Sequence, residues 1–241
     1  MKRLLVGVSI FVCVAAVGFA EDKKNPCTTP VDRKDKGWVA RHESFVARAK
    51  KGDVDVVFLG DSITHGWEGA GKKVWADKFE KLKAANFGIG GDRTEHVLWR
   101  ITEGKELEGI SPKVAVLMIG TNNVGSNSPE QIAEGVGAIV STLRHKNIKV
   151  LLLGVFPRAS APKEEKVAPA ASLNPKIKQI NDIIKKMDDG KNIVYMDIGS
   201  KFLTEDGGLS REIMPDLLHL SPKGYEIWAD AITPKLEEML K

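Results

Sequence analysis

The sequence predicts one α/β domain in which a parallel sheet is covered by helices on both faces. Five short apolar runs are typical of buried strands, and they lie at residues 56–62, at a short segment from residue 85, and at 114–120, 149–155 and 193–198. Helical patterns separate these runs, and such alternation favours parallel strands joined by crossover helices. A length of 241 residues with 42% hydrophobic and 28% charged residues is enough for one large core. No repeat or linker is evident after residue 37.

The first twenty residues are set apart from this domain. Lys2 and Arg3 precede an apolar run over residues 4–17, and residues 18–20 have the small-x-Ala pattern of a cleavage site. We therefore expect a secretory signal peptide at 1–20, cleaved near Ala20, and a secreted or periplasmic protein. The run is short for a membrane span and no second long run follows, so the mature form is expected to have no stable span. A retained N-terminal anchor is the alternative.

Charge and cysteine content exclude several classes of function. Removing residues 1–20 takes two of the 36 basic residues and none of the 32 acidic ones, which leaves the mature chain at a net charge of +2. The charges are interspersed, so nothing indicates nucleic acid. Cys13 lies in the signal segment, and Cys27 alone cannot form an internal disulfide. Residues 21–36 are polar and contain prolines, and we expect them to be a flexible lead to a domain over 37–241.

Helices are predicted from apolar residues at helical spacing and from their capping residues. In order, they occupy residues 37–51, a loop and helix over 67–82, 94–101, a segment that begins at Ser128 and Pro129, 174–187, and a last segment that begins at Ser221 and Pro222. Two segments lack a clear pattern. Residues 158–172 are expected to form either a lid or a solvated insertion, and residues 203–214 are expected to be irregular.

Short polar or glycine groups lie just beyond several predicted strands or before the last helix. Ser62 follows the first strand, Gly91 the second and Asn122 the third, while Asp216 and His219 precede the last helix. Loops at the carboxyl ends of parallel strands meet at one edge of the sheet, where α/β folds bind ligands. These five residues are therefore expected to converge on one site.

The five residues match the needs of acyl transfer. His219 is a suitable base for the hydroxyl of Ser62, and Asp216, three residues before it, can orient the imidazole ring. The backbone N–H groups of Ser62 and Gly91 and the side-chain amide of Asn122 can donate to an oxyanion. The sequence has no metal-binding motif, no dinucleotide fingerprint and no phosphate-binding loop, so neither a metal nor a cofactor is expected.

Four blocks of residues resemble the SGNH, or GDSL, esterase superfamily. The blocks are Gly60-Asp61-Ser62, then Asn86, Gly88 and Gly91, then Gly120-Thr121-Asn122, and then Asp216 with His219. The surrounding residues are similar to those of the catalytic subunits of the platelet-activating-factor acetylhydrolases and their bacterial relatives. The resemblance spans about residues 53–232. It implies a flavodoxin-like three-layer α/β/α sandwich, Ser62 as nucleophile with His219 as base and Asp216 as its orienter, and Gly91 and Asn122 as oxyanion donors.

Other polar residues receive less specific interpretations. Four histidines are expected to be structural, although His65 could line the pocket: His42, His65, His96 and His145. Asp61 and Asp92 are expected to brace their turns through backbone hydrogen bonds. Three residues are expected as contacts at the rim of the site: Arg93, Asn123 and Arg158.

These observations predict a secreted serine esterase that hydrolyses a short acyl ester, in particular an acetyl ester, of a carbohydrate or lipid. The animal enzymes that the chain resembles are cytosolic, whereas this chain has an export signal, so the resemblance does not extend to the substrate. One alternative is a lysophospholipase or longer-chain lipase. Another is an extracellular carbohydrate-binding module without catalytic activity. The intact set of Ser62, Asp216 and His219 argues against the latter.

Overall fold

The centre of the protein is a five-stranded parallel sheet, as predicted. A computed structural model describes residues 24–241, whereas the predicted signal peptide 1–20, its cleavage after Ala20, and Cys13 lie outside the described residues. The strands are β1 Val56–Gly60, β2 Ala84–Gly88, β3 Val114–Met118, β4 Lys149–Leu153 and β6 Ile193–Met196. They lie in the order β2-β1-β3-β4-β6 with parallel pairing throughout. This is the flavodoxin-like order, in which the winding reverses between β1 and β3.

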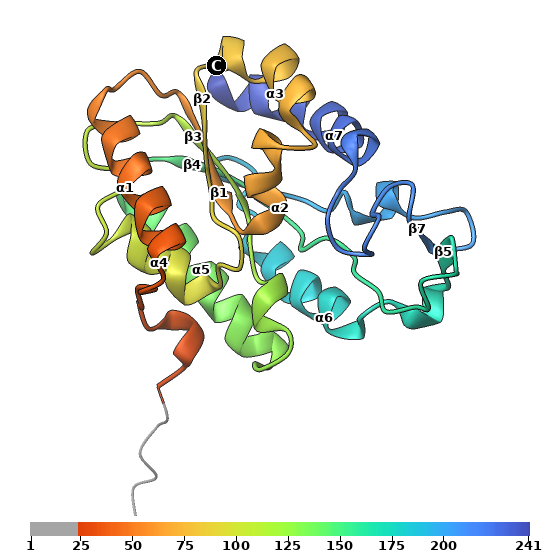
Figure 1. Ribbon diagram of the computed structural model, residues 1–241. Coiled ribbons are helices and arrows are strands. Elements are labelled where there is room, and N and C mark those ends of the chain that lie inside the picture. The colour runs from red at the N-terminus through yellow and green to blue at the C-terminus, as the bar shows by residue number, and fades with distance from the viewer. Residues whose placement is uncertain (1–23) are drawn as a thin grey trace, which may run out of the picture.

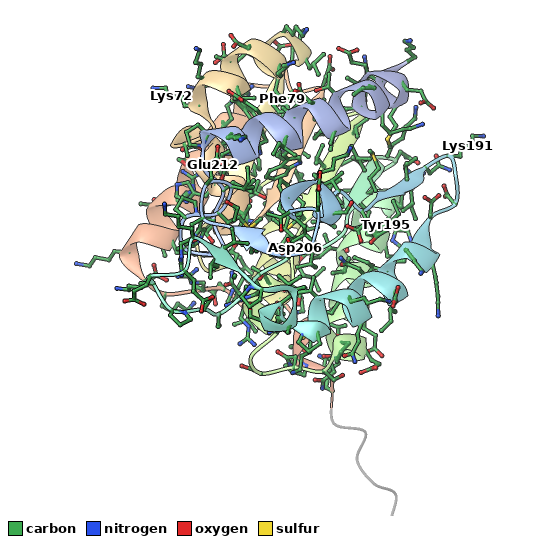
Figure 2. The ribbon with its side chains drawn as sticks, turned by 90° about the vertical axis from the view of Figure 1, so that its right-hand side faces the viewer. Lys72, Phe79, Lys191, Tyr195, Asp206 and Glu212 are labelled. Carbon is green, nitrogen blue, oxygen red and sulfur yellow. The ribbon has the colours of Figure 1, made fainter. Side chains whose placement is uncertain are left out.

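Helices cover both faces of this sheet and make three layers (Figure 1). On one face lie α1 Lys36–Lys50, α4 Thr94–Ile101, α5 Pro129–His145 and α6 Pro175–Ile184, and on the other α2 Ser62–His65, α3 Lys72–Lys78 and α7 Pro222–Leu240. Successive side chains of a strand point to opposite faces. In β1, Val57 and Leu59 therefore join the first core, and Val56 and Phe58 the second. Figure 2, in which Phe79 is labelled, shows α3 alongside α7 on the second face.

The predicted helix starts are marked by capping side chains. At α5, Ser128 Oγ accepts the N–H of Gln131 at 3.2 Å, and the Gln131 side chain accepts the N–H of Ser128 at 3.1 Å. At α7, Ser221 Oγ accepts the N–H of Gly224 at 3.3 Å. Asp35 caps α1 in the same way through the N–H of Trp38. Among the helices of residues 24–241, none has both the length and the apolar content needed to cross a bilayer.

The segment expected as a flexible lead is attached to the domain through Asn25, Cys27 and Val31, so that expectation is wrong for this part of the segment. Cys27, in the 3-10 helix Pro26–Thr28, is fully buried in the first core. Asn25 Nδ2 donates to the carbonyl of Gln131 at 3.0 Å, and the N–H of Val31 donates to the carbonyl of Glu95 at 3.2 Å. A polar composition concealed this docking, because it rests on one buried thiol and on hydrogen bonds rather than on an apolar pattern.

A small antiparallel ribbon links two segments for which no regular structure was predicted. Strand β5 Val167–Ala168 pairs with β7 Leu209–Ser210. The guanidinium of Arg211 donates to the carbonyl oxygens of Glu165 and Pro162 on one side and of Pro215 on the other. The segment 158–172 is thus attached to the turn that precedes α7. Strands of two residues are too short to show an alternating pattern, so the sequence did not reveal them.

Candidate active site

Ser62 is the first residue of α2 and follows directly on β1. Asp61 caps this short helix, since its Oδ1 accepts the N–H of Ile63 at 3.0 Å. Gly88 at the end of β2 allows the helix to pack there, because a Cβ on Gly88 would lie 2.3 Å from the backbone nitrogen of His65. The sharp turn from β1 into α2 therefore places Ser62 at the carboxyl edge of the sheet, beside the reversal point of the winding.

Asp216 and His219 lie in a tight turn before α7. Asp216 Oδ1 accepts the N–H groups of Leu218 at 3.1 Å and of His219 at 2.7 Å. Leu217, directly after Asp216, adopts a left-handed φ of 63° and buries its side chain in the second core. The turn brings Asp216 Oδ2 to 2.6 Å from His219 Nδ1. The three-residue spacing is thus sufficient for a local carboxylate–imidazole pair, as predicted.

The serine and the imidazole lie far apart in the sequence but are in contact in the folded chain. Ser62 Oγ lies 2.8 Å from His219 Nε2, although 157 positions separate the two residues. A carboxylate only accepts hydrogen bonds, so His219 Nδ1 donates to Asp216 and Nε2 is free to accept the hydroxyl proton of Ser62. Partial burial opposes ionisation of Asp216, but hydrogen bonds from the ring and backbone of His219 lower its pKa below the usual range. The carboxylate is therefore ionised at neutral pH.

The site is open to water. The side chain of His219 is 43% exposed and that of Asp216 is 56% exposed. Ser62, next to the imidazole of His219, is half-buried. A water molecule can therefore reach the imidazole from the surface.

The turn that contains Gly91 lies next to Ser62. A Cβ on the preceding residue, Gly90, would be 3.8 Å from the Ser62 Cβ. Gly91 itself has a φ of 79°, a conformation that glycine adopts without strain. Within residues 24–241, the N–H groups of Ser62 and Gly91 have no protein acceptor. Both are therefore available to a ligand at this edge.

Asn122 is held against the same turn. It lies in a short 3-10 helix, Thr121–Asn123, that follows β3, and its Nδ2 donates to the carbonyl of Asp92 at 2.8 Å. An amide NH₂ has two hydrogens, so one hydrogen remains after this bond. The structure thus brings all five predicted site residues to the carboxyl edge of β1, β2 and β3.

A buried network of charged side chains holds the turn that contains Gly91. Asp92 belongs to this network, so the sequence interpretation of Asp92 as only a turn brace was too narrow. Asp92 is fully buried, and its Oδ1 accepts the indole N–H of Trp38 at 2.8 Å. Arg100 Nε lies 2.8 Å from Asp92 Oδ2, so the two side chains form an ion pair. The N–H of Nε does not point closely enough at this oxygen to make a hydrogen bond. Arg100 Nη1 donates to Glu106 at 2.7 Å. Burial works against the charge of Arg100, but the two carboxylates raise its pKa above the ordinary value.

Arg100 also ties together the two strands that lead to the site. Its Nη1 donates to the carbonyl of Phe87 in β2 at 2.8 Å, and its Nη2 donates to the carbonyl of Gly60 in β1 at 3.3 Å. Arg100 lies on the inward side of α4 beside apolar Ile101. A charged residue directly beside the apolar positions of this helix was the signal in the sequence that could have identified it.

The residues expected at the rim have structural partners instead. Asn123 is fully buried, where its Oδ1 accepts the N–H of Thr94 at 3.1 Å, so its prediction as a rim contact is wrong. Arg158 donates to the carbonyl of Thr121, next to Asn122, at 3.0 Å. Arg93 donates to the side chain of Asn127 at 2.8 Å. These bonds fix the loops that surround the site.

The remaining histidines have varied surroundings. His42 Nδ1 lies 2.7 Å from Glu106 Oε1, and His96 Nδ1 accepts the N–H of Arg93 at 3.1 Å, while His145 is exposed at the end of α5. His65 is near the turn, since a Cβ on Gly90 would be 3.9 Å from its Nδ1. Burial, assisted by Arg41, lowers the pKa of His65.

A separate groove lies at the other end of the same sheet edge. It has a volume of about 820 Å³ and lies beside α6 and β6, and Val155 and Ile177 are among the residues that line it. Tyr195, labelled in Figure 2, also lines the groove, together with Asp197. None of the predicted site residues lines this groove. The candidate site therefore lies on an open part of the surface rather than in this cavity.

Asp61 provides a test of the electrostatics beside Ser62. Its carboxyl is fully buried, its Oδ2 has no hydrogen-bond partner within residues 24–241, and burial raises its pKa from 3.8 to about 7. The carboxyl of Asp61 thus binds a proton more tightly in the folded chain than in the unfolded chain. The resulting stability is fully present below pH 3.8 and is lost as the pH rises through 7.

We expect Asp61→Asn to remove this loss. The free energy of unfolding of the variant should fall less between pH 4 and pH 8 than that of the unmodified chain, by about 4 kcal/mol at 1.36 kcal/mol per pKa unit. Urea unfolding at a series of pH values measures this difference. Parallel pH profiles for the two proteins would show that Asp61 ionises normally in the folded chain.

A five-stranded parallel sheet with a serine, an imidazole and a carboxylate in hydrogen-bonded sequence at its carboxyl edge defines an α/β serine hydrolase class. Residues 58–227 match the GDSL-like Lipase/Acylhydrolase family. Platelet-activating factor acetylhydrolase IB subunit alpha2 of Rattus norvegicus is 39% identical over 194 residues, which cover 79% of this chain and 80% of the relative. The chain therefore belongs to the GDSL-like lipase/acylhydrolase family, and it is a carboxylic ester hydrolase.

Solved structures confirm the fold class. A GDSL-like lipase from Bacteroides thetaiotaomicron is 23% identical and superposes with a TM-score of 0.65 over 83% of this chain and 97% of that chain. An acetyl xylan esterase is 25% identical, with a TM-score of 0.56 over 75% of this chain and 98% of that chain.

Proposed function

We propose that this protein is an exported serine esterase that removes short acyl groups, in particular acetyl groups, from carbohydrate or lipid esters. The observation that carries the proposal is the 2.8 Å contact between Ser62 Oγ and His219 Nε2, with Asp216 2.6 Å behind the imidazole. The similar rat protein is an acetylhydrolase by name, and a similar solved structure is an acetyl xylan esterase. Both names support an acetyl group as the acyl part.

In the proposed acylation step, Ser62 Oγ attacks the ester carbonyl carbon while its proton passes to His219 Nε2. The carbonyl oxygen becomes an oxyanion, and the N–H groups of Ser62 and Gly91 and the free amide hydrogen of Asn122 donate to it. The bond to the alcohol oxygen then breaks, and His219 gives its proton to that oxygen. The alcohol leaves, and the acyl group remains on Ser62.

Deacylation repeats these steps with water. His219 Nε2 takes a proton from water as the water oxygen attacks the acyl carbon, and the same donors hold the second oxyanion. When the bond to Ser62 Oγ breaks, His219 returns the proton to Oγ and the acid is released. Asp216 keeps the ring in the required tautomer throughout. An oxyanion donor of this kind is typically worth about 3 kcal/mol of the barrier.

Export is part of the proposal and rests on the basic, apolar and small residues of segment 1–20. We expect protein expressed from the full sequence to begin at Glu21 and to be found outside the cytoplasm. N-terminal sequencing of the cell fractions tests this expectation. An intact Met1 in the membrane fraction would support the retained anchor instead.

The substrate is tested with p-nitrophenyl esters from acetyl to octanoyl, with Ser62→Ala as the blank. Highest kcat/KM for the acetyl ester supports the proposal, whereas highest kcat/KM for the octanoyl ester supports a lysophospholipase or longer-chain lipase. Acetate release from acetylated xylan and from an acetyl glycerophospholipid then distinguishes carbohydrate from lipid. Retention of the protein on xylan with no acid released from any ester would support a binding module.

A further inference from the structure

Arg33 connects the N-terminal segment to the turn that contains Gly91. It precedes α1 and lies outside the residues that match the family. Its Nη1 donates to the carbonyl oxygen of Gly90 at 2.8 Å and lies 3.3 Å from Asp92 Oδ1. On its other side, Nε donates to Asp35 Oδ2 at 3.1 Å, and Asp35 is itself the cap of α1. The guanidinium is thus held between the start of a helix and the turn.

The bond to Gly90 determines where the N–H of Gly91 points. The carbonyl of Gly90 and the N–H of Gly91 belong to one peptide unit, and a planar trans unit directs its C=O and N–H in opposite directions. A donor that fixes the carbonyl therefore also fixes the N–H. Two consecutive glycines can otherwise rotate this unit at little cost, because neither has a Cβ to restrict its dihedrals.

Within residues 24–241, Arg33 is the only donor to the carbonyl of Gly90. The guanidinium also covers the outer side of Gly91, where a Cβ would lie 3.2 Å from its Nη1. Rotation of the peptide unit would break the bond to Arg33 and turn the N–H of Gly91 away from its present direction.

We propose that Arg33 is a positioning residue, which aims the N–H of Gly91 at the oxyanion through the carbonyl of Gly90. The proposal rests on the function proposed above. It makes the segment after the predicted signal peptide a working part of the enzyme. That segment is held against the domain by buried Cys27 and by the backbone hydrogen bond from Val31 to Glu95. These contacts place Arg33 next to the turn that contains Gly91.

The test compares Arg33→Met with Arg33→Lys and Arg48→Met. Arg48 is a matched control, because its Nη1 also donates to a glycine carbonyl, that of Gly52 at 2.7 Å, but beyond the far end of α1. For an acetyl ester, we expect Arg33→Met to lower kcat by about 10-fold to 100-fold, less than the loss of a whole oxyanion donor, with KM changed by less than about 3-fold. Arg33→Lys should restore part of kcat, and Arg48→Met should leave kcat unchanged.

A second measurement separates positioning from general loss of structure. A trifluoromethyl ketone analogue of the acetyl ester forms a tetrahedral adduct with an oxyanion, so its Ki should rise in Arg33→Met by the same factor as kcat/KM falls. The Ki of the alcohol product, which has no oxyanion, should not change. An unchanged kcat in Arg33→Met, or a fall in kcat without a change in the Ki of the ketone, would overturn the inference. Full activity in Ser62→Ala would instead overturn the proposed function, so the two failures are distinguishable.

Discussion

Replacement of Ser62 by alanine is expected to lower kcat for an acetyl ester by about 10⁴-fold to 10⁶-fold, as for other serine nucleophiles. The variant keeps the oxyanion donors but has no oxygen to attack the carbonyl carbon. It also cannot form the acyl-enzyme, so the burst of alcohol release should disappear. KM should change little, because Ser62 contributes mainly to the reacting centre rather than to binding. Stopped-flow and steady-state assays of the purified mature chain measure both effects.

The same reasoning applies to His219, because the hydroxyl and the imidazole act as one unit. His219→Ala should lose nearly as much activity as Ser62→Ala, and the double variant should be no less active than either single variant. His145→Ala serves as the control, since His145 is exposed at the end of α5. Losses that multiply in the double variant would show that the two side chains act independently, contrary to the 2.8 Å contact.

Replacement of Arg100 by methionine is expected to give the largest loss of stability. Arg100 is fully buried between two buried carboxylates, Asp92 and Glu106. Methionine fills part of the space but leaves Glu106 without its guanidinium partner and leaves Asp92 with Arg33 alone, 3.3 Å from Asp92 Oδ1. Removal of one partner from a buried ion pair costs about 3–5 kcal/mol. The bonds to the carbonyls of Phe87 and Gly60 are lost as well. The free energy of unfolding, from urea titration, measures the effect.

A second variant makes this prediction specific to charge. Adding Glu106→Gln to Arg100→Met removes the buried carboxylate that no longer has a guanidinium partner, so the double variant should regain part of the lost stability. Arg48→Met, at a half-exposed position of α1, should lose much less than Arg100→Met. An Arg100→Met chain as stable as the unmodified chain would show that the buried network contributes no net stability. So would a double variant that is less stable than the single variant.

The alternation of strands and helices was predictable because it depends on local burial patterns. A buried strand such as β3 is a continuous apolar run, and a helix such as α5 has both apolar spacing and a capping serine, Ser128. The pair of Asp216 and His219 was predictable for a similar reason, because three residues in one turn suffice to bring a carboxylate to an imidazole. The carboxyl ends of parallel strands lie at one edge of a sheet, and this general property predicted that Ser62, Gly91 and Asn122 lie on one edge.

Only the tertiary structure decided the contacts between distant segments. The docking of Arg33 on Gly90 and the pairing of β5 with β7 each join parts of the chain that share no local pattern. Ser62 and His219 were expected at one edge of the sheet, but the 2.8 Å contact between Oγ and Nε2 came only from the structure. Periodicity reports which face of an element is buried, but it does not report what lies against that face. A hydrogen bond between two single residues leaves no periodic trace, so the chain alone determined the chemistry available at the site and folding determined how its donors are held.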